Sequence, residues 1–252
     1  MKICRTKNEL QEILKNDFSG KSIGFVPTMG ALHEGHHCLV KRAINENQIC
    51  VVSIYLNSTQ FNDPEDLESY PASLEQDISS LQNSQVNLVF LPNYKEIYPD
   101  NYSYRIHEIK HSLDLCGKNR PGHFDGVLTV VMKLFNIVRP TKAYFGEKDY
   151  QQLELIRGMV EAYFMDVQII ACPIVRDNNG LALSSRNKKL KSQGLQMAKY
   201  FANSLRTHKT LGELKTDLEK QNIQIDYLKD LDNRRYAAVK IENVRLIDNV
   251  QI

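Results

Sequence analysis

Short apolar runs alternate with longer amphipathic stretches along the first two thirds of the chain. The apolar runs have the length and composition of buried strands and lie at 23–26, 49–56, 86–91, 142–145 and 167–171. Between them, apolar residues at helical spacing predict helices over 8–15, from near 33 to 44, around 74–81, and over 127–138 and 150–164. Weak alternation at 102–109 predicts an edge strand, and 63–71 is expected to be a polar loop. This repetition predicts an α/β fold with an open parallel sheet.

The pattern changes after residue 174. Helices are predicted over 188–207 and 211–220, and strands over 223–228 and 237–247. Two helices followed by two strands are typical of a small α+β domain. A chain of 252 residues has room for one or two domains. We therefore expect a larger α/β domain over 1–174 and a smaller α+β domain over 175–252.

The first of these strands leads into a stretch with the features of a phosphate site. The strand is expected to end at Val26, and Pro27-Thr28-Met29-Gly30 then forms a turn before a helix that begins near His33. His33 and His36 share a face of the first helical turn, and Gly35 leaves space between them. An anion at this helix N-terminus would meet free backbone N–H groups, the helix dipole and two imidazoles. In the alternative interpretation, one histidine caps the helix and the other packs.

Polar residues follow two other predicted strands. Asn57 and Gln60 come after the second strand, and Lys148 and Asp149 come after the strand at 142–145. Because ligands of open parallel sheets bind at the carboxyl ends of the strands, the two amides are placed to hold a small polar molecule. Lys148 offers a charge for phosphate, Asp149 a helix cap or a ribose contact, and Gln152 lies one turn further on. A turn rich in amide side chains is the alternative for the first pair.

Two loops add further candidates for anion binding. Residues 116–126 are rich in glycine, proline and basic side chains and precede a predicted helix. Ser184, Ser185 and Arg186 place two hydroxyls beside a guanidinium, which could close over a triphosphate through charge-assisted hydrogen bonds. Alternatively, Ser184 and Ser185 begin a solvated helix with a serine as its N-cap.

The composition disfavours several classes of protein, namely nucleic-acid binders, disulfide-rich or zinc proteins, and membrane proteins. The 32 basic and 30 acidic residues give a net charge of +2, so no polyanionic partner such as a nucleic acid is indicated. Five scattered cysteines without Cys-x-x-Cys spacing favour a reducing compartment over a disulfide framework or a zinc site. The N-terminus turns polar early and no apolar run reaches the ~18 residues of a membrane span. We expect a cytoplasmic protein without membrane partners.

Five motifs together resemble the pantothenate synthetase family. They are Pro27 to His36, Asn57 to Phe61, Arg120-Pro121-Gly122-His123-Phe124, Gly146 to Gln152 and Gly180 to Asn187. The likeness runs in order from about Lys21 to Asn187. It implies a Rossmann-like nucleotidylyltransferase domain of the His-x-Gly-His class with helices on both faces of its sheet, a C-terminal lid domain and usually a homodimer. It also implies an ATP-dependent ligase that condenses pantoate with β-alanine through pantoyl adenylate, releasing AMP and pyrophosphate.

The resemblance also implies residue roles. The ATP site would comprise Met29, Gly30, Ala31, Leu32, His33, Glu34, Gly35, His36, Gly146, Glu147, Lys148, Asp149, Val175, Leu183, Ser184, Ser185 and Arg186. Catalysis would depend on His33, His36, Lys148 and Arg186, with His36 as the acid. Pantoate would bind Gln60 and Gln152, and β-alanine would enter near Asn57 and Gln60. Mg²⁺ would arrive on the ATP phosphates without a protein cage.

Three departures from the family pattern accompany the likeness. Ser58 stands where proline is common, Ala72 where arginine is common, and the chain after Asn187 is short. Two other functions stay open at this stage. One is a His-x-Gly-His enzyme that transfers a nucleotide onto a phosphate ester, and the other is a non-catalytic nucleic-acid binder, which the near-neutral charge disfavours.

Overall fold

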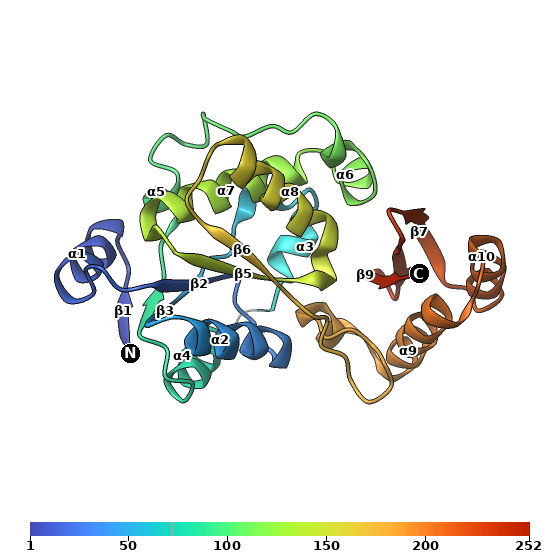
Figure 1. Cartoon of the computed structure of the whole chain (residues 1–252). Helices are drawn as coiled ribbons and strands as arrows, with labels where there is room; N and C mark the ends of the chain where they lie inside the picture. Colours follow the sequence, from blue (N-terminus) through green and yellow to red (C-terminus); the bar gives the residue numbers. More distant parts are fainter. Residues whose placement is uncertain (72) are drawn as a thin grey trace.

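The computed structural model describes residues 1–71 and 73–252, and its larger unit is built on a six-stranded parallel sheet (Figure 1). Ala72, one of the departures noted above, lies outside the described residues. The strands are β1 (Lys2–Cys4), β2 (Ile23–Thr28), β3 (Ile49–Ile54), β4 (Leu88–Phe90), β5 (Lys142–Gly146) and β6 (Gln168–Cys172). Their order is β1-β4-β3-β2-β5-β6, and all the pairs are parallel. From β4 to β6 this is Rossmann order, which reverses between β2 and β5.

Helices cover both faces of this sheet, as expected. Phe25 and Val51 point into a core on one face, whereas Val26 and Val52 point into a second core on the other. The first core is closed by α1 (Lys7–Asp17), α7 (His123–Val138) and α8 (Tyr150–Ala162), and the second by α2 (Glu34–Glu46) and α4 (Leu74–Gln82). A strand that is buried on both sides explains why the strand segments are apolar throughout.

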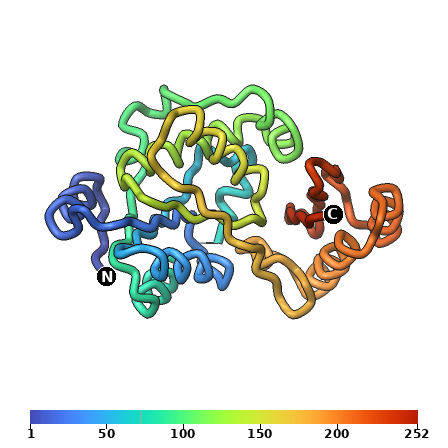
Figure 2. The backbone as a smooth tube through the Cα atoms, in the orientation of Figure 1, coloured from blue at the N-terminus to red at the C-terminus, as the bar shows by residue number. Residues whose placement is uncertain are grey.

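The C-terminal unit has a core of its own. It contains α9 (Ser192–Thr207), α10 (Leu211–Lys220) and the antiparallel strands β7 (Gln224–Leu231), β8 (Arg234–Ile241) and β9 (Val244–Gln251). Phe201, Leu214 and Val239 lie in that core. Figure 2 shows the chain leaving β6 and crossing to this unit, whose strands then turn back toward the larger one. Tyr227 and Ile247 pack against the core of the larger unit, so the two units are in contact.

Short helices complete the chain. They are α3 (Pro64–Glu68), α5 (Tyr94–Ile97), α6 (Cys116–Asn119) and the 3₁₀ turns η1 (Ser58–Gln60), η2 (His111–Leu113), η3 (Glu147–Asp149) and η4 (Ser185–Lys189). The predicted loop at 63–71 is wrong in part, because Asp63 caps α3 and Pro64 occupies its first turn. The loop at 116–126 is likewise interrupted by α6, and α7 begins at His123 rather than at Val127.

Two strand predictions are also wrong. Residues 102–109 form no strand, and the sheet edge beside β4 is taken by β1, whose three residues gave no pattern long enough to recognise. The single strand expected at 237–247 is two strands of a hairpin. Glu242 and Asn243 between them both have positive φ, 49° and 66°, the turn geometry that matches the twist of paired strands.

Strand β2 extends two residues beyond Val26. Pro27 pairs with Ser53 of β3, while the pairing of β2 with β5 ends at Phe25. Since the described residues give β2 no partner on the β5 side beyond that point, the missing N–H of Pro27 removes no ladder bond there. The extension carries the chain to the sheet edge at which the predicted ligand residues meet.

Candidate active site

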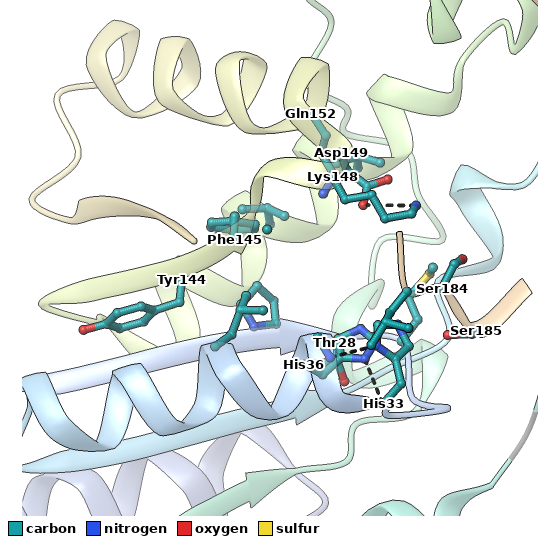
Figure 3. A pocket seen from close by; sticks show the side chains of 18 of the residues that line it. Thr28, His33, His36, Tyr144, Phe145, Lys148, Asp149, Gln152, Ser184 and Ser185 are labelled. Atoms are coloured by element: carbon teal, nitrogen blue, oxygen red, sulfur yellow. Dashed lines mark hydrogen bonds and ion pairs between the residues drawn. The ribbon is translucent and has the colours of Figure 1, made fainter. Parts of the chain in front are cut away.

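A cavity of about 230 Å³ lies at the carboxyl ends of β2 and β5, where the strand order reverses. This is the place at which open parallel sheets bind ligands. Figure 3 shows the two walls: His33 and His36 project from the start of α2, and Lys148, Asp149 and Gln152 lie opposite them. Ser184 and Ser185 come from the segment that leads into the C-terminal unit.

The two histidines form a cap at the start of α2. His33 is the N-cap residue, and its Nδ1 accepts a hydrogen bond from the Gly35 N–H at 3.1 Å. Nδ1 of His36 accepts one from the His33 N–H at 3.3 Å, and the ring centroids are 4.1 Å apart. Because both Nδ1 atoms accept, each neutral ring carries its proton on Nε2. The alternative interpretation is therefore confirmed for His33, which caps the helix, but it is wrong for His36, which completes the same cap and lines the cavity. Capping through Nδ1 leaves two Nε2–H donors for an anion.

Both rings are neutral at physiological pH. Burial, followed by the positive charges of Lys148 and Lys188, lowers the pKa of His33 to about 4. Burial, followed by the charges of His33 and His37, lowers the pKa of His36 to about 3. A bound triphosphate would raise both values, since a neighbouring negative charge favours the imidazolium. In the free site the histidines are hydrogen-bond donors, and the acid role of His36 stays a prediction.

The turn before these histidines is held by a residue that the sequence motifs did not include. Gly30 and Ala31 both have positive φ, 85° and 51°, which is unfavourable for alanine. Asp77 of α4, only 3% exposed, accepts hydrogen bonds from the N–H groups of Ala31 and Leu32, each at 2.8 Å. A carboxylate with two charge-assisted bonds offsets the strain of this turn. Its signal was a charged residue within the apolar stripe of α4.

The opposite wall is fixed from the C-terminal unit. Asn249 of β9, 2% exposed, donates from Nδ2 to the carbonyls of Glu147 and Lys148, both at 2.9 Å. Lys148 Nζ lies 3.9 Å from Asp149 Oδ2 at the cavity. No sequence motif indicated Asn249, because its contact with η3 spans about a hundred residues.

The amides after β3 are ordered by mutual hydrogen bonds. Asn57 is 1% exposed and donates from Nδ2 to Oε1 of Gln60 at 3.1 Å, while its Oδ1 accepts from Tyr98 Oη at 2.9 Å. Nε2 of Gln60 lies 3.0 Å from Sδ of Met29. Asn57 is thus placed to orient Gln60, and Gln152 contributes the amide from α8.

The segment at 184–186 crosses the cavity. Ser184 caps η4 by accepting from the Arg186 N–H at 3.3 Å, as the N-cap alternative predicted. Ser185 donates to the carbonyl of Ala31 at 3.2 Å, which ties the segment to the histidine loop. Arg186 donates to Asp66 Oδ2 at 2.7 Å and also lines the cavity. All three side chains are therefore at the site.

The structure brings most of the predicted site residues together around one cavity. The cavity is lined by Met29, His33, Gly35, His36, Asn57, Gln60, Gly146, Lys148, Asp149, Gln152, Val175, Leu183, Ser184, Ser185 and Arg186. Gly30, Ala31, Leu32, Glu34 and Glu147 are not among its lining residues. The turn at 30–32 faces Asp77, Glu34 is exposed beside Cys38, and Glu147 offers its carbonyl to Asn249.

His123 supports Gln60, one of the amide residues that line the cavity, by a hydrogen bond to its backbone carbonyl. It is 7% exposed, its Nδ1 donates to the Gln60 carbonyl at 2.8 Å, and its Nε2 accepts from Arg120 at 3.0 Å. Because an arginine can only donate, this ring carries its proton on Nδ1. Burial, followed by the charge of Arg120, lowers the pKa of His123 from 6.5 to about 3.

The low pKa of His123 predicts acid sensitivity. The unfolded chain binds a proton at His123 below its ordinary pKa while the folded chain does not, so stability is present above that value and is lost as the pH falls. We expect the free energy of unfolding to drop by about 2 kcal/mol between pH 7 and pH 5 from this group. Urea unfolding at pH 7, 6 and 5 measures the slope. A flat profile, or an equal slope in His123→Asn, would contradict the assignment.

The residues present also show how a metal would be held. Among the cavity-lining residues of the described chain, Asp149 is the one carboxylate. The histidine, lysine, serine and arginine side chains at 33, 36, 148 and 184–186 contribute imidazole, ammonium, hydroxyl and guanidinium groups. In residues 1–71 and 73–252 no group of three or more His, Cys, Asp or Glu has the arrangement of a metal site. This set fits Mg²⁺ only as an ion carried by phosphates.

Fold and site together define a class of protein. A Rossmann-type sheet, neutral paired histidines at the helix that follows its first central strand, and a lysine at the next strand end define a nucleotide-binding enzyme of the His-x-Gly-His class. Residues 2–251 match the family model described as pantoate-beta-alanine ligase. The chain belongs to the pantoate-beta-alanine ligase family.

Individual relatives agree over almost their whole length. A protein named pantothenate synthetase from Bdellovibrio bacteriovorus is 51% identical, with 99% of each chain covered. The crystal structure of a pantoate-beta-alanine ligase from Francisella tularensis, complexed with beta-gamma ATP and beta-alanine, has a TM-score of 0.96 at 43% identity and covers 100% of this chain and 97% of that one. The pantothenate synthetase structure from Thermus thermophilus gives a TM-score of 0.90 at 37% identity, with 100% and 99% covered. In the part of the chain that the structure describes, no helix is long and apolar enough to span a membrane.

Proposed function

We propose that this chain condenses pantoate with β-alanine to pantothenate, with ATP as the activating substrate. In the first step a carboxylate oxygen of pantoate attacks the α-phosphorus of ATP, the bond to the bridging oxygen breaks, and pyrophosphate leaves. In the second step the free amine of β-alanine attacks the acyl carbon, the bond to AMP breaks, and the nitrogen loses a proton. The observation that carries this function is one cavity in which a phosphate-binding wall faces a pair of amides.

The phosphate wall supplies what the first step needs. Attack at phosphorus requires alignment and neutralised charge rather than a protein nucleophile. The Nε2–H groups of His33 and His36 donate to phosphate oxygens, and Lys148 and Arg186 add positive charge as pyrophosphate departs. The two histidine rings are held by the hydrogen bonds of the α2 cap, and the turn before them is held by Asp77. Mg²⁺ bound to the phosphates of ATP would neutralise further charge there, and the cavity-lining residues of the described chain would reach it through those phosphates.

The amide wall is suited to pantoate. Gln60 and Gln152 can bind the hydroxyls and the carboxylate of a small acid without fixing a charge on it. We expect Gln152→Ala to raise the dissociation constant of pantoate at least tenfold, since the substrate loses a hydrogen-bond partner in the cavity, and to change ATP binding less than twofold. Calorimetric titration with each substrate measures both. Glu161→Gln, an exposed change on the same helix, is the matched control. Unchanged pantoate affinity would remove Gln152 from the site.

The C-terminal unit acts as a lid in this proposal. We place the boundary between domains 1–174 and 175–252, and the contacts of Ser185 with Ala31 and of Arg186 with Asp66 support a segment that covers the cavity. A mixed anhydride reacts with water, so closure protects the intermediate. The chain after Asn187 is not short beside these relatives, since 99% of the Bdellovibrio bacteriovorus protein is covered. Asn249 of β9 supports the wall of the cavity by donating to the carbonyls of Glu147 and Lys148.

Compartment and assembly follow as proposals. The five cysteines are unpaired, including Cys38 on the surface, which supports a cytoplasmic enzyme. A homodimer is the expectation from the family resemblance.

Product analysis tests the proposed function. Purified protein with ATP, Mg²⁺, pantoate and β-alanine is expected to form pantothenate, AMP and pyrophosphate in equal amounts. Release of ADP and phosphate would contradict the adenylate route, and transfer of AMP onto a phosphate ester would support the other His-x-Gly-His function.

A further inference from the structure

The motif Arg120-Pro121-Gly122-His123-Phe124 leads into the start of α7 and has no substrate contact in the proposed function. Arg120 lies behind the amide wall, where its Nη2 donates to the Gln60 carbonyl at 3.2 Å and its Nη1 donates to His123 at 3.0 Å. A guanidinium has five N–H donors. Three of them are therefore available to another acceptor.

Charge around Arg120 is unbalanced. One small cavity beside the site is lined by the guanidinium groups of Arg120, Arg186 and Arg245, together with Lys148 and the carboxylates of Asp66, Asp149 and Asp248. Asp248 is paired with Arg176 at 2.6 Å. Arg186 is paired with Asp66 at 2.7 Å, and Arg245 is paired with Asp226 at 2.7 Å. Within the described ranges 1–71 and 73–252, no carboxylate lies within 4.0 Å of a nitrogen of Arg120. Burial and the other arginines lower the pKa of Arg120 to about 10, so the group is still charged at neutral pH.

The guanidinium of Arg120 lines a small cavity that adjoins the main one. The small cavity, about 70 Å³, shares Lys148, Asp149 and Arg186 with the main one. Arg120 also lines a third cavity of about 40 Å³ that includes Gln152. The guanidinium thus contacts the backbone of Gln60 and shares a cavity with Gln152, on the side that faces the C-terminal unit. A half-buried cation that no carboxylate of the described residues pairs with favours an anionic ligand there.

We propose that Arg120 binds the carboxylate of β-alanine and so aims its amine at the acyl carbon of the adenylate. This inference rests on the proposed function. The amine must approach an acyl group held by Gln60 and Gln152, and the planar guanidinium fork can hold a carboxylate through two parallel hydrogen bonds. His123 is a positioning residue, because its ring links Arg120 to the Gln60 carbonyl and fixes their separation.

The triphosphate of ATP is the other anion with matching chemistry, and the two half-reactions distinguish it. Pantoate-dependent exchange of pyrophosphate into ATP needs no β-alanine, whereas pantothenate formation does. Arg120→Gln is expected to raise the KM for β-alanine about 30-fold and to leave the exchange rate and the KM for ATP within threefold of the parent. Arg157→Gln, a surface arginine paired with Glu154, is the matched control. Equal losses in both half-reactions would assign Arg120 to the phosphates and overturn the proposal.

An acceptor series tests the same contact without relying on one variant. The parent is expected to use β-alanine at least 30-fold better, in kcat/KM, than β-alaninamide, which keeps the amine and lacks the charge. Arg120→Gln should reduce this ratio to about threefold, and Arg120→Lys, which keeps the charge without the fork, should give an intermediate ratio. If Arg120→Gln does not fold, Arg120→Lys decides by the same ratio. A ratio unchanged from the parent in the folded variant would contradict the proposal. Absence of pyrophosphate exchange in the parent would instead contradict the proposed function.

Discussion

His36→Ala is expected to lower the rate of adenylate formation by roughly 10²–10³-fold, the usual effect of removing one fixed donor from a transition state that develops charge. The reason is the Nε2–H group, which the cap at Nδ1 turns toward the cavity. The dissociation constant of pantoate should change less than twofold, because in the proposed function pantoate binds Gln60 and Gln152 on the other wall. Single-turnover release of AMP or pyrophosphate measures the rate, and calorimetry measures pantoate binding.

Two further variants separate chemistry from folding. Alanine also removes the acceptor for the His33 N–H, which should decrease stability by about 1 kcal/mol. Glutamine at the third helical position can still accept from that N–H. His36→Gln should therefore keep the parent free energy of unfolding but show the same loss in the rate of adenylate formation as His36→Ala. His37→Ala, the neighbouring imidazole outside the cavity lining, should retain the parent rate. Parent activity in His36→Gln, or equal losses of rate and pantoate affinity in His36→Ala, would contradict the role of His36.

Asp77→Asn is expected to lower kcat for adenylation by roughly 10²-fold, although Asp77 does not line the cavity. An amide can accept only one of the two N–H bonds at 2.8 Å and turns an N–H toward the other donor. The turn at Gly30 and Ala31, strained by two positive φ angles, would then shift the start of α2. A displacement of about 1 Å in a positioned group costs rate on this scale.

A change on the same helix provides the control. Glu75→Gln makes the same chemical substitution at an exposed position of α4 and should retain the parent kcat and stability. Asp77→Asn should leave the dissociation constant of pantoate within twofold, which a general loss of folding would not do. A kcat for Asp77→Asn within twofold of that for Glu75→Gln would show that the carboxylate does not position the loop.

Local signals in the sequence were sufficient for the framework of the fold and for the placement of the two histidines at the cavity. Apolar runs and helical periodicity placed the main strands, and the His-x-Gly-His spacing after a strand and a proline located the helix start at His33. The capping alternative and the phosphate interpretation proved compatible, since the cap uses Nδ1 and leaves Nε2 free. These features depend on neighbours within a few residues, which a sequence displays directly.

Features that depend on distant partners were not predictable from the same patterns. Strand β1 has only three residues, and its pairing with β4 brings together segments more than eighty residues apart. Asp77 gave one signal, its position in an apolar stripe, but the loop that it holds lies 45 residues away. Asn249 and Arg120 act on η3 and Gln60 through the approach of separate elements. The spacing of residues along the chain does not indicate which distant elements come into contact.

Pantoate-dependent exchange of labelled pyrophosphate into ATP, with Mg²⁺ and without β-alanine, tests whether this chain activates pantoate as an adenylate. We expect rapid exchange that requires pantoate, because adenylation is reversible and needs no β-alanine. Folded, ATP-binding protein that shows no exchange with pantoate would contradict it.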